Sequence, residues 1–126
     1  MGVPGRTVLV ADDDVGHLRL LELVLGAYKF DVVTVENGQD AIAYLEANTP
    51  DMMILDVNMP FMTGLEVCSR ARRLGRLKNV PVIIMTALTD EDTRRQADAA
   101  GADLFLNKPL TGTDLRGAIS SLFAAR

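Results

Sequence analysis

Five short apolar runs alternate with amphipathic segments along the chain. Each run is continuously hydrophobic, which is typical of strands that are covered on both faces. Strands that alternate with helices of about 10–15 residues indicate βαβ units and a parallel sheet. We therefore predict an α/β fold in which a helix follows each strand, with strands at 8–11, 32–35, 52–55, 82–85 and 104–106.

Short polar side chains precede the amphipathic segments and predict where the helices begin. The candidate N-caps are Asp14, Asn37, Thr63, Thr89 and Thr111. Asp92 and Asp114 stand three residues after the last two, so these two starts resemble capping boxes with Asp in the Glu position. The fourth helix is predicted to carry two i,i+4 ion pairs, Asp90 with Arg94 and Glu91 with Arg95.

Size and composition fit one domain. A chain of 126 residues, of which 48% are hydrophobic, can bury a core, and we expect a single domain over 1–126 with 1–5 as a flexible tail. A net charge of −4 argues against sequence-independent binding of nucleic acid. No apolar run approaches the roughly 20 residues of a membrane span. The single cysteine, Cys68, suits a reducing compartment, and we expect a cytoplasmic protein.

Polar side chains follow four of the five predicted strands. Asp12 and Asp13 follow the first, Asp56 the third, Thr86 the fourth and Lys108 the fifth. The carboxyl ends of parallel strands share one edge of the sheet, which is where open α/β sheets bind ligands. We therefore expect a carboxylate cluster, a hydroxyl and an ammonium group to meet in one site.

This set of groups matches phosphoryl transfer to a side chain. Three carboxylates in one place favour either a proton or a bound cation, and oxygen ligands suit Mg²⁺. Asp56, on the central strand, is the candidate nucleophile, and Asp12 and Asp13 would hold the metal. Lys108 would pair with Asp56 and then with a phosphoryl oxygen, to which the Thr86 hydroxyl would also donate.

From about Arg6 to Phe123 the chain resembles the receiver domains of two-component response regulators. Four motifs carry the resemblance: Val8–Asp14, Asp56–Gly64, Met85-Thr86-Ala87 and Lys108-Pro109. The resemblance implies a flavodoxin-like, doubly wound (βα)5 sandwich of three layers with strand order 2-1-3-4-5. It also implies a cis Lys108-Pro109 bond.

The resemblance further implies a signalling phosphoacceptor, which catalyses only its own phosphorylation and dephosphorylation. Asp56 would accept a phosphoryl group from a sensor histidine kinase or a histidine phosphotransfer protein in the presence of Mg²⁺, with the backbone carbonyl of Asn58 completing the metal site. Thr86 would then move inward and Phe105 would fill the vacated space. The fourth helix, fifth strand and fifth helix would form the output surface, for a downstream effector or for self-dimerisation.

The first helix, expected from Asp14 to about Tyr28, carries more leucine than one face can hold. The face predicted to be buried consists of His17, Leu20, Leu21, Val24 and Tyr28. Leu18, Leu23 and Leu25 then remain, and exposed apolar surface can mark a docking site. Because the family docks its phosphodonors on this helix, we hypothesise that Leu18 and Leu25 contact the donor. His17 is expected to be a partly buried, hydrogen-bonded residue, and a role in tuning the site is the alternative.

Three other functions remain open. The spacing of Asp12 and Asp14 mimics the nucleophile motif of haloacid-dehalogenase-type phosphatases, although that reading leaves the motif around Asp56 unexplained. A nucleotide- or flavin-binding module would need a glycine-rich phosphate loop, which does not follow the first strand. A receiver that has lost phosphorylation and serves only for interaction is the third. The chain is either a single-domain regulator or the receiver of a longer protein.

Overall fold

The computed structural model describes residues 5–87 and 90–124, and within them five parallel strands form one sheet in the order β2-β1-β3-β4-β5. The strands are β1 (Thr7–Ala11), β2 (Asp31–Val35), β3 (Met52–Asp56), β4 (Val82–Thr86) and β5 (Leu104–Asn107). The helices are α1 (Val15–Ala27), α2 (Gly38–Ala47), α3 (Gly64–Arg72), α4 (Glu91–Ala100) and α5 (Gly112–Ala124). The predicted doubly wound arrangement and its strand order are confirmed.

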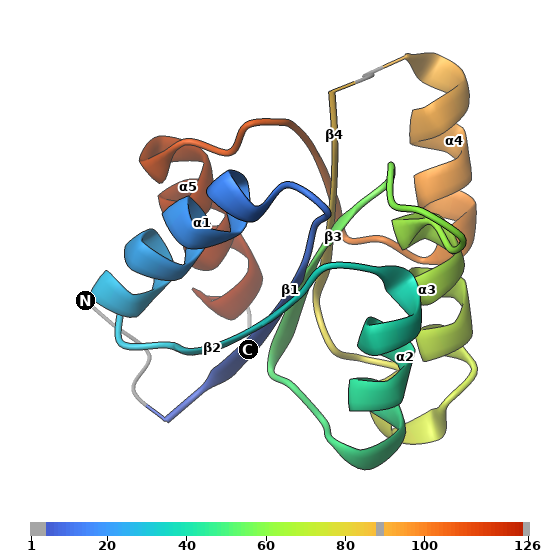
Figure 1. Cartoon of the computed structure of the whole chain (residues 1–126), viewed down its shortest axis with the longest axis horizontal. Helices are drawn as coiled ribbons and strands as arrows, with labels where there is room; N and C mark the ends of the chain where they lie inside the picture. Colours follow the sequence, from blue (N-terminus) through green and yellow to red (C-terminus); the bar gives the residue numbers. More distant parts are fainter. Residues whose placement is uncertain (1–4, 88–89, 125–126) are drawn as a thin grey trace.

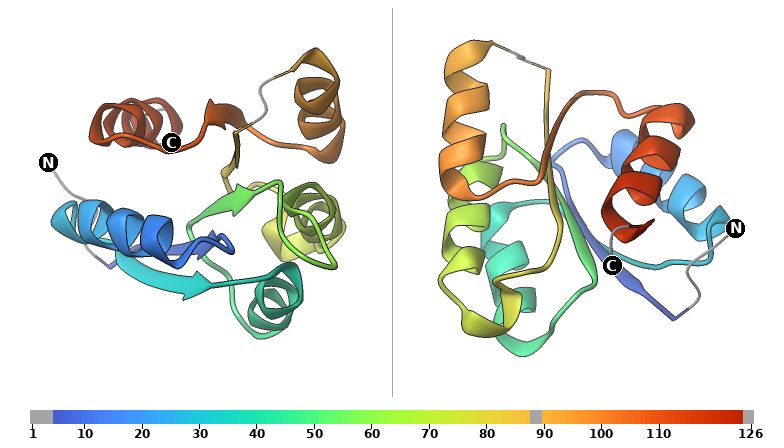
Figure 2. Two further views of the ribbon diagram at one scale, coloured as in Figure 1. Left: turned by 45° about the horizontal axis from the view of Figure 1, so that its top comes forward. Right: turned by 180° about the vertical axis from the view of Figure 1, so that it is seen from behind.

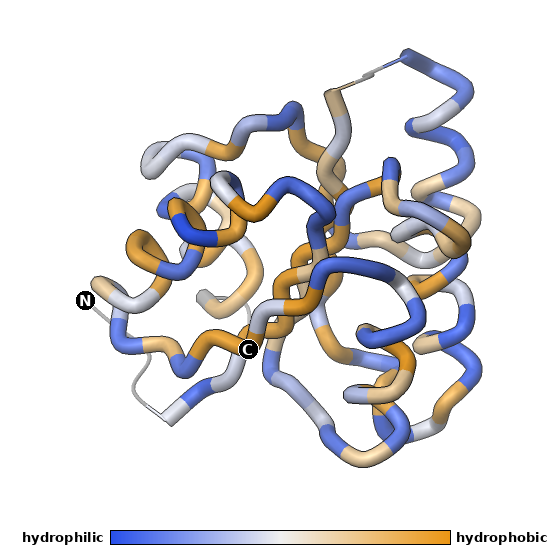
Figure 3. Tube along the Cα trace, viewed as in Figure 1, coloured by the Kyte–Doolittle hydropathy of each residue, from blue (hydrophilic) through white to orange (hydrophobic). Residues whose placement is uncertain are grey.

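The helices cover both faces of the sheet. Helices α1 and α5 lie on one face, and α2, α3 and α4 lie on the other (Figures 1 and 2). Every residue of β3 and β4 is buried, as the continuously apolar runs predict, whereas β2 and β5 are partly exposed because they are the edge strands of the sheet. Figure 3 shows that hydrophobic residues concentrate in the strands, whereas α4 is largely hydrophilic.

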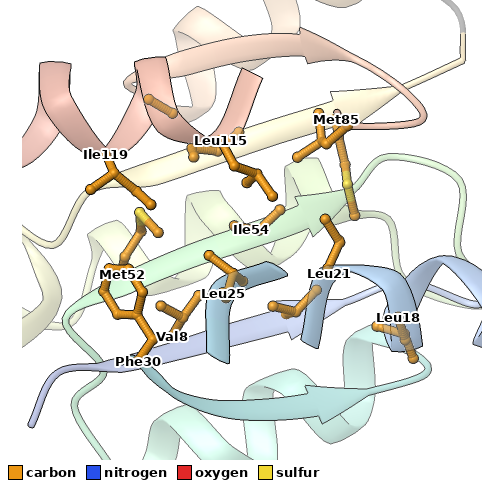
Figure 4. Packing of buried hydrophobic residues seen from close by; sticks show 14 residues of the cluster. Val8, Leu18, Leu21, Leu25, Phe30, Met52, Ile54, Met85, Leu115 and Ile119 are labelled. Carbon is orange, nitrogen blue, oxygen red and sulfur yellow. The ribbon is translucent and has the colours of Figure 1, made fainter. Parts of the chain in front are cut away.

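Side chains of successive strand residues enter two separate cores because they point to opposite faces of the sheet. Val8 and Ile54 belong to the core beneath α1 and α5, whereas Leu9 and Leu55 belong to the core beneath α2, α3 and α4. Figure 4 shows the first of these cores, in which Phe30 and side chains of α1 and α5 meet those of the strands.

Four of the five predicted helix starts are observed. Asp14 and Asn37 accept the backbone N–H groups of His17 and Asp40, at 3.2 and 2.8 Å. Thr63 and Glu66 form a complete capping box. At α5, the Thr111 hydroxyl and the Asp114 carboxylate each accept the other residue's backbone N–H at 3.0 Å.

The start of α4 differs from the prediction. Thr89 lies outside the described residues, and the N-cap is Asp90, whose side chain accepts the N–H of Thr93 at 2.7 Å. Its carboxylate is therefore engaged at the cap, and Arg94 lies 4.0 Å from Glu91 instead. Arg95 pairs with Asp92. Both ion pairs thus have i,i+3 spacing and the predicted i,i+4 pairs were wrong, although both spacings make helix neighbours.

The buried face of α1 also differs from the prediction. Leu18, Leu21 and Leu25 are buried, with Leu18 only 5% exposed, whereas Leu20 and Leu23 are 45% and 75% exposed. His17 and Leu21 are buried as predicted, and the centre of the buried stripe is rotated by roughly 60° towards Leu18 and Leu25, less than the 100° between successive residues. Leu18 and Leu25 belong to the core (Figure 4), so the hypothesis that they contact a phosphodonor was wrong.

The Lys108-Pro109 peptide is cis, as predicted. Within residues 5–87 and 90–124, none of the helices has the length and apolar character that crossing a membrane requires.

Candidate functional site

The predicted site residues meet at one edge of the sheet. Asp12 follows β1, Asp56 and Thr86 end β3 and β4, and Lys108 follows β5. Asp12 and Thr86 are fully buried and Asp56 is 1% exposed, whereas Asp13 faces solvent. The parallel register brings these strand ends together, which is the convergence expected from the sequence.

Lys108 connects two of the carboxylates. Its ammonium Nζ lies 2.8 Å from Asp12 Oδ1 and 3.0 Å from Asp56 Oδ2. The Lys108 backbone N–H donates to the carbonyl oxygen of Thr86 at 2.9 Å. This bond, made next to the cis peptide, fixes the segment from which the lysine side chain reaches back over the sheet edge.

Asp12 accepts hydrogen bonds on both of its oxygens. Oδ1 also accepts the backbone N–H of Asp14 at 2.9 Å, and Oδ2 lies 2.6 Å from Nδ1 of His17. The other ring nitrogen of His17, Nε2, accepts the backbone N–H of Leu110 at 3.2 Å. His17 is therefore buried and hydrogen-bonded, more completely than the sequence suggested.

The loop after β3 is held close to Asp56. The Asn58 N–H donates to Asp56 Oδ1 at 3.2 Å, and the loop returns to the sheet at Gly64. A Cβ at Gly64 would lie 2.3 Å from the carbonyl oxygen of Asp56, so only glycine allows this approach. Within the loop Phe61 is 90% exposed, with a positive φ of 68°.

Burial and charge give the two buried carboxylates different acidities. Burial, together with the neighbouring Asp12 carboxylate, raises the pKa of Asp56 to about 6, and Lys108 opposes the rise. Burial also acts to raise the pKa of Asp12, but the hydrogen bonds from Lys108, the Asp14 N–H and His17 outweigh it and lower that pKa. Burial acts to lower the pKa of Lys108, and the two carboxylates together raise it.

The acidic groups form a candidate cation site. Asp12, Asp13 and Asp56 each offer a carboxylate oxygen, and these oxygens lie within 4.8 Å of one another. A set of oxygen donors with one residue open to solvent fits a hard divalent cation such as Mg²⁺, which keeps part of its water shell.

Thr86 and Phe105 lie on the same face of the sheet. Phe105 pairs with Ile84, and Thr86 stands two residues after Ile84, so both side chains point towards α4. Phe105 is half-buried, and the guanidinium carbon of Arg94, on α4, lies 5.0 Å from its ring centroid. The Arg94 contact and the link from His17 to Leu110 are the two features that sequence reasoning missed, because neither has a motif.

Comparisons with known proteins agree on one family. The family model "Response regulator receiver domain" matches residues 8–120. Protein RcaC of Microchaete diplosiphon is 39% identical over 117 residues, which are 93% of this chain and 18% of that protein. The transcriptional regulatory protein PrrA of Mycobacterium tuberculosis is 35% identical over 125 residues, 99% of this chain and 53% of PrrA.

The fold is likewise shared with solved structures. The chemotaxis protein CheY4 of Vibrio cholerae superposes with a TM-score of 0.88 at 28% identity, covering 94% of this chain and 98% of CheY4. The chain thus spans between about a fifth and a half of the length of the two curated relatives, and nearly all of CheY4. The chain belongs to the receiver domain family of two-component response regulators, whose members are signalling proteins with this flavodoxin-like fold.

Proposed function

We propose that this chain is a working phosphoacceptor in which Asp56 takes a phosphoryl group from a phosphohistidine of a sensor histidine kinase or a histidine phosphotransfer protein. The observation that carries the proposal is the Lys108 ammonium, which lies within 3.0 Å of both Asp12 and Asp56. A fixed cation beside a buried carboxylate offsets the negative charge that gathers when that carboxylate approaches phosphorus.

The transfer is a displacement at phosphorus. An oxygen of Asp56 forms the new bond to phosphorus while the bond from phosphorus to the donor's imidazole nitrogen breaks, and the imidazole keeps that electron pair. Lys108 pairs with a phosphoryl oxygen, and the Thr86 hydroxyl donates to another. Asp56 at the end of a central strand is held rigid by the surrounding sheet, which favours the in-line geometry.

The donor set fits Mg²⁺ as the cation of this site. We propose that Asp12, Asp13 and Asp56, with the backbone carbonyl of Asn58, hold it, directly or through water. When bound, the ion neutralises charge on the transferring group and on the acidic cluster. The exposed carboxylate of Asp13 gives the cation access from solvent.

The proposed output signal is a change in side-chain packing. We propose that Thr86 moves towards the phosphoryl group and that Phe105, which shares its face of the sheet, takes up the space. Phe105 carries no hydroxyl, so the change is one of shape, read on a surface made by α4, β5 and α5. That surface would bind a downstream effector protein or a second copy of this chain. Neither nucleic acid nor membrane contact is part of the proposal.

The phosphatase alternative is weakened by the state of Asp12. A nucleophile needs an oxygen that is free to reach phosphorus, but the oxygens of Asp12 accept hydrogen bonds from Lys108, the Asp14 N–H and His17. Asp56 accepts fewer hydrogen bonds: one on Oδ2, from the lysine that the reaction itself would redirect, and one of 3.2 Å on Oδ1, from the Asn58 N–H. We also propose that the chain forms a single domain. The free thiol of Cys68 suits a reducing compartment, and we therefore propose a cytoplasmic location.

Incubation with acetyl phosphate and Mg²⁺, followed by intact mass measurement, tests the chemistry. We expect one phosphoryl group to be added to the wild-type chain and none to Asp56→Asn. Asp31→Asn, which changes an exposed aspartate at the amino-terminal end of β2, is the matched control and should be modified as fast as wild type. Modification that survives Asp56→Asn but is lost in Asp12→Asn would favour the phosphatase.

A further inference from the structure

His17 is a buried residue next to the site whose ring has partners from distant parts of the chain. The residue is 6% exposed and lies in the first turn of α1. Nδ1 lies 2.6 Å from Asp12 Oδ2, and Nε2 lies 3.2 Å from the backbone nitrogen of Leu110, which is 93 residues away in sequence. One imidazole therefore joins the end of β1 to the segment between β5 and α5.

The partners fix which ring nitrogen carries the proton. A backbone N–H can only donate, so Nε2 accepts from Leu110 and carries no hydrogen. Nδ1 then carries the proton of the neutral ring and donates it to Asp12. The tautomer follows from the hydrogen-bond pattern, because a ring protonated on Nε2 alone would leave two donors facing each other at Leu110 and two acceptors at Asp12.

This ring fixes the orientation of the Asp12 carboxylate. Its Oδ2 is turned towards His17, so Oδ1 is the oxygen that accepts from Lys108 at 2.8 Å and from the Asp14 N–H at 2.9 Å. The second bond of His17, at Leu110, lies two residues after Lys108 in the chain. The same imidazole therefore holds both members of the Asp12–Lys108 pair in place.

We propose that His17 is a positioning residue of the metal and phosphoryl site: it orients Asp12 through Nδ1 and secures the Lys108 segment through Nε2. The inference rests on the proposed function, because it assumes that the acidic cluster binds Mg²⁺. Outer partners of metal-binding carboxylates and histidines typically change metal affinity by about 10–100-fold when they are removed. An apolar residue at 17 would leave Asp12 Oδ2 buried without its donor and free to turn.

Three variants distinguish the hydrogen bond at Nδ1 from the hydrogen bond at Nε2. His17→Leu removes both bonds. His17→Asn keeps an amide nitrogen where Nδ1 stood and so can still donate to Asp12, whereas the longer His17→Gln can still accept from Leu110 through its amide oxygen. The Mg²⁺ dissociation constant is followed through the backbone amide shifts of residues 57–59, and the melting temperature is measured without metal.

We expect Mg²⁺ to bind His17→Leu about 10-fold or more weakly than wild type. His17→Asn should recover most of the affinity and His17→Gln little of it, even where both melt alike. The ¹⁵N spectrum of the wild-type ring should show Nδ1 protonated and Nε2 bare at neutral pH.

A merely structural role would lower the melting temperature of all three variants and leave their Mg²⁺ affinities equal to wild type, which would overturn the inference. Equal recovery by Asn and Gln would overturn it as well. If His17→Leu does not fold, the comparison of the Asn and Gln variants decides alone. If the wild-type chain does not bind Mg²⁺, by contrast, the proposed function itself is refuted. Asp13→Asn, which removes one of the proposed ligands, is the reference for a damaged metal site.

Discussion

The guanidinium of Arg72 donates two hydrogen bonds to the carbonyl oxygen of Gly101, from Nε at 3.0 Å and from Nη2 at 2.8 Å. It also donates to the carbonyls of Leu77 and Val80 and pairs with Asp103 at 3.0 Å. Arg72, at the end of α3, thus contacts the residue that follows α4, the segment before β4 and the residue before β5. Gly101 has φ +96°, and a Cβ there would lie 2.9 Å from Arg72 Cγ.

Arg72→Leu is expected to lower the free energy of unfolding by about 3 kcal/mol, because three carbonyls lose a charged donor and hydrogen bonds to charged groups contribute about 1.5–3 kcal/mol each. Arg72→Lys should recover only part of the loss, since one ammonium cannot span these partners. Urea unfolding measures the free energy of unfolding of both variants. Arg70→Leu, on the exposed side of α3, is the control and should change stability by less than about 0.5 kcal/mol.

Gly64→Ala is expected to slow phosphorylation by acetyl phosphate and to cost about 1–3 kcal/mol of stability. The added methyl group would meet the Asp56 carbonyl oxygen at 2.3 Å, so the backbone that carries the phosphoacceptor must shift. In Gly117→Ala, on an exposed position of α5, the methyl group meets nothing within 4 Å. That control should keep wild-type phosphorylation and gain about 0.5–1 kcal/mol. Equal rates in both variants would contradict the prediction.

Two leucines of α1 should differ in how much an introduced charge lowers stability. Leu18→Asp places a carboxylate in the core at a position that is 5% exposed, and we expect a loss of about 3 kcal/mol or more in urea unfolding. Leu23→Asp, at a position that is 75% exposed, should change stability by less than about 0.5 kcal/mol.

The exposed leucines also revise the expectation for the phosphodonor. With a histidine kinase that phosphorylates the wild-type chain, we expect Leu23→Asp to slow transfer while phosphorylation by acetyl phosphate stays unchanged. A charge on exposed apolar surface of α1 weakens docking without touching the site. Equal slowing of both reactions would argue against docking at this face.

Phe105→Ala is expected to leave the rate of phosphorylation nearly unchanged and to weaken the response of α4 and α5. In the proposed switch the ring transmits the change at Thr86 by packing, and the guanidinium carbon of Arg94 lies 5.0 Å from the ring centroid in a cation–π contact. The amide shift changes of residues 91–100 and 112–124 on phosphorylation should shrink. Arg94→Gln, which removes the cation but keeps the ring, should retain most of them. Undiminished shift changes in Phe105→Ala would count against this route.

The thiol of Cys68 should resist modification in the folded protein. Burial raises its pKa from 9.0 to about 11, with Arg72 opposing and Asp103 adding to the rise. The folded state therefore binds this proton more tightly than the unfolded state, and stability falls as the pH rises from about 9 through 11. At pH 8 an aromatic disulfide reagent should react only as fast as the protein unfolds. Cys68→Ala should remove this part of the pH dependence.

The sequence alone determined the sheet, the strand order through its family resemblance, and the edge where Asp12, Asp56, Thr86 and Lys108 meet. Continuous apolar runs indicate strands, which are fully buried at the centre of the sheet and partly exposed at its edges. The residues that follow parallel strands then lie at one edge of the sheet. Caps such as Asp14 and Thr63 were equally readable, because a cap is a contact between residues three apart in the chain.

Only the tertiary structure decided which stripe of α1 is buried, how His17 joins Asp12 to Leu110, and that Arg72 reaches Gly101. Leucines at 18, 20, 21, 23 and 25 leave the helix several nearly equal apolar faces. The rotation that the fold adopts is the one that brings His17 against Asp12 and Leu110. Such contacts join residues that are up to 93 positions apart, and no local pattern records them.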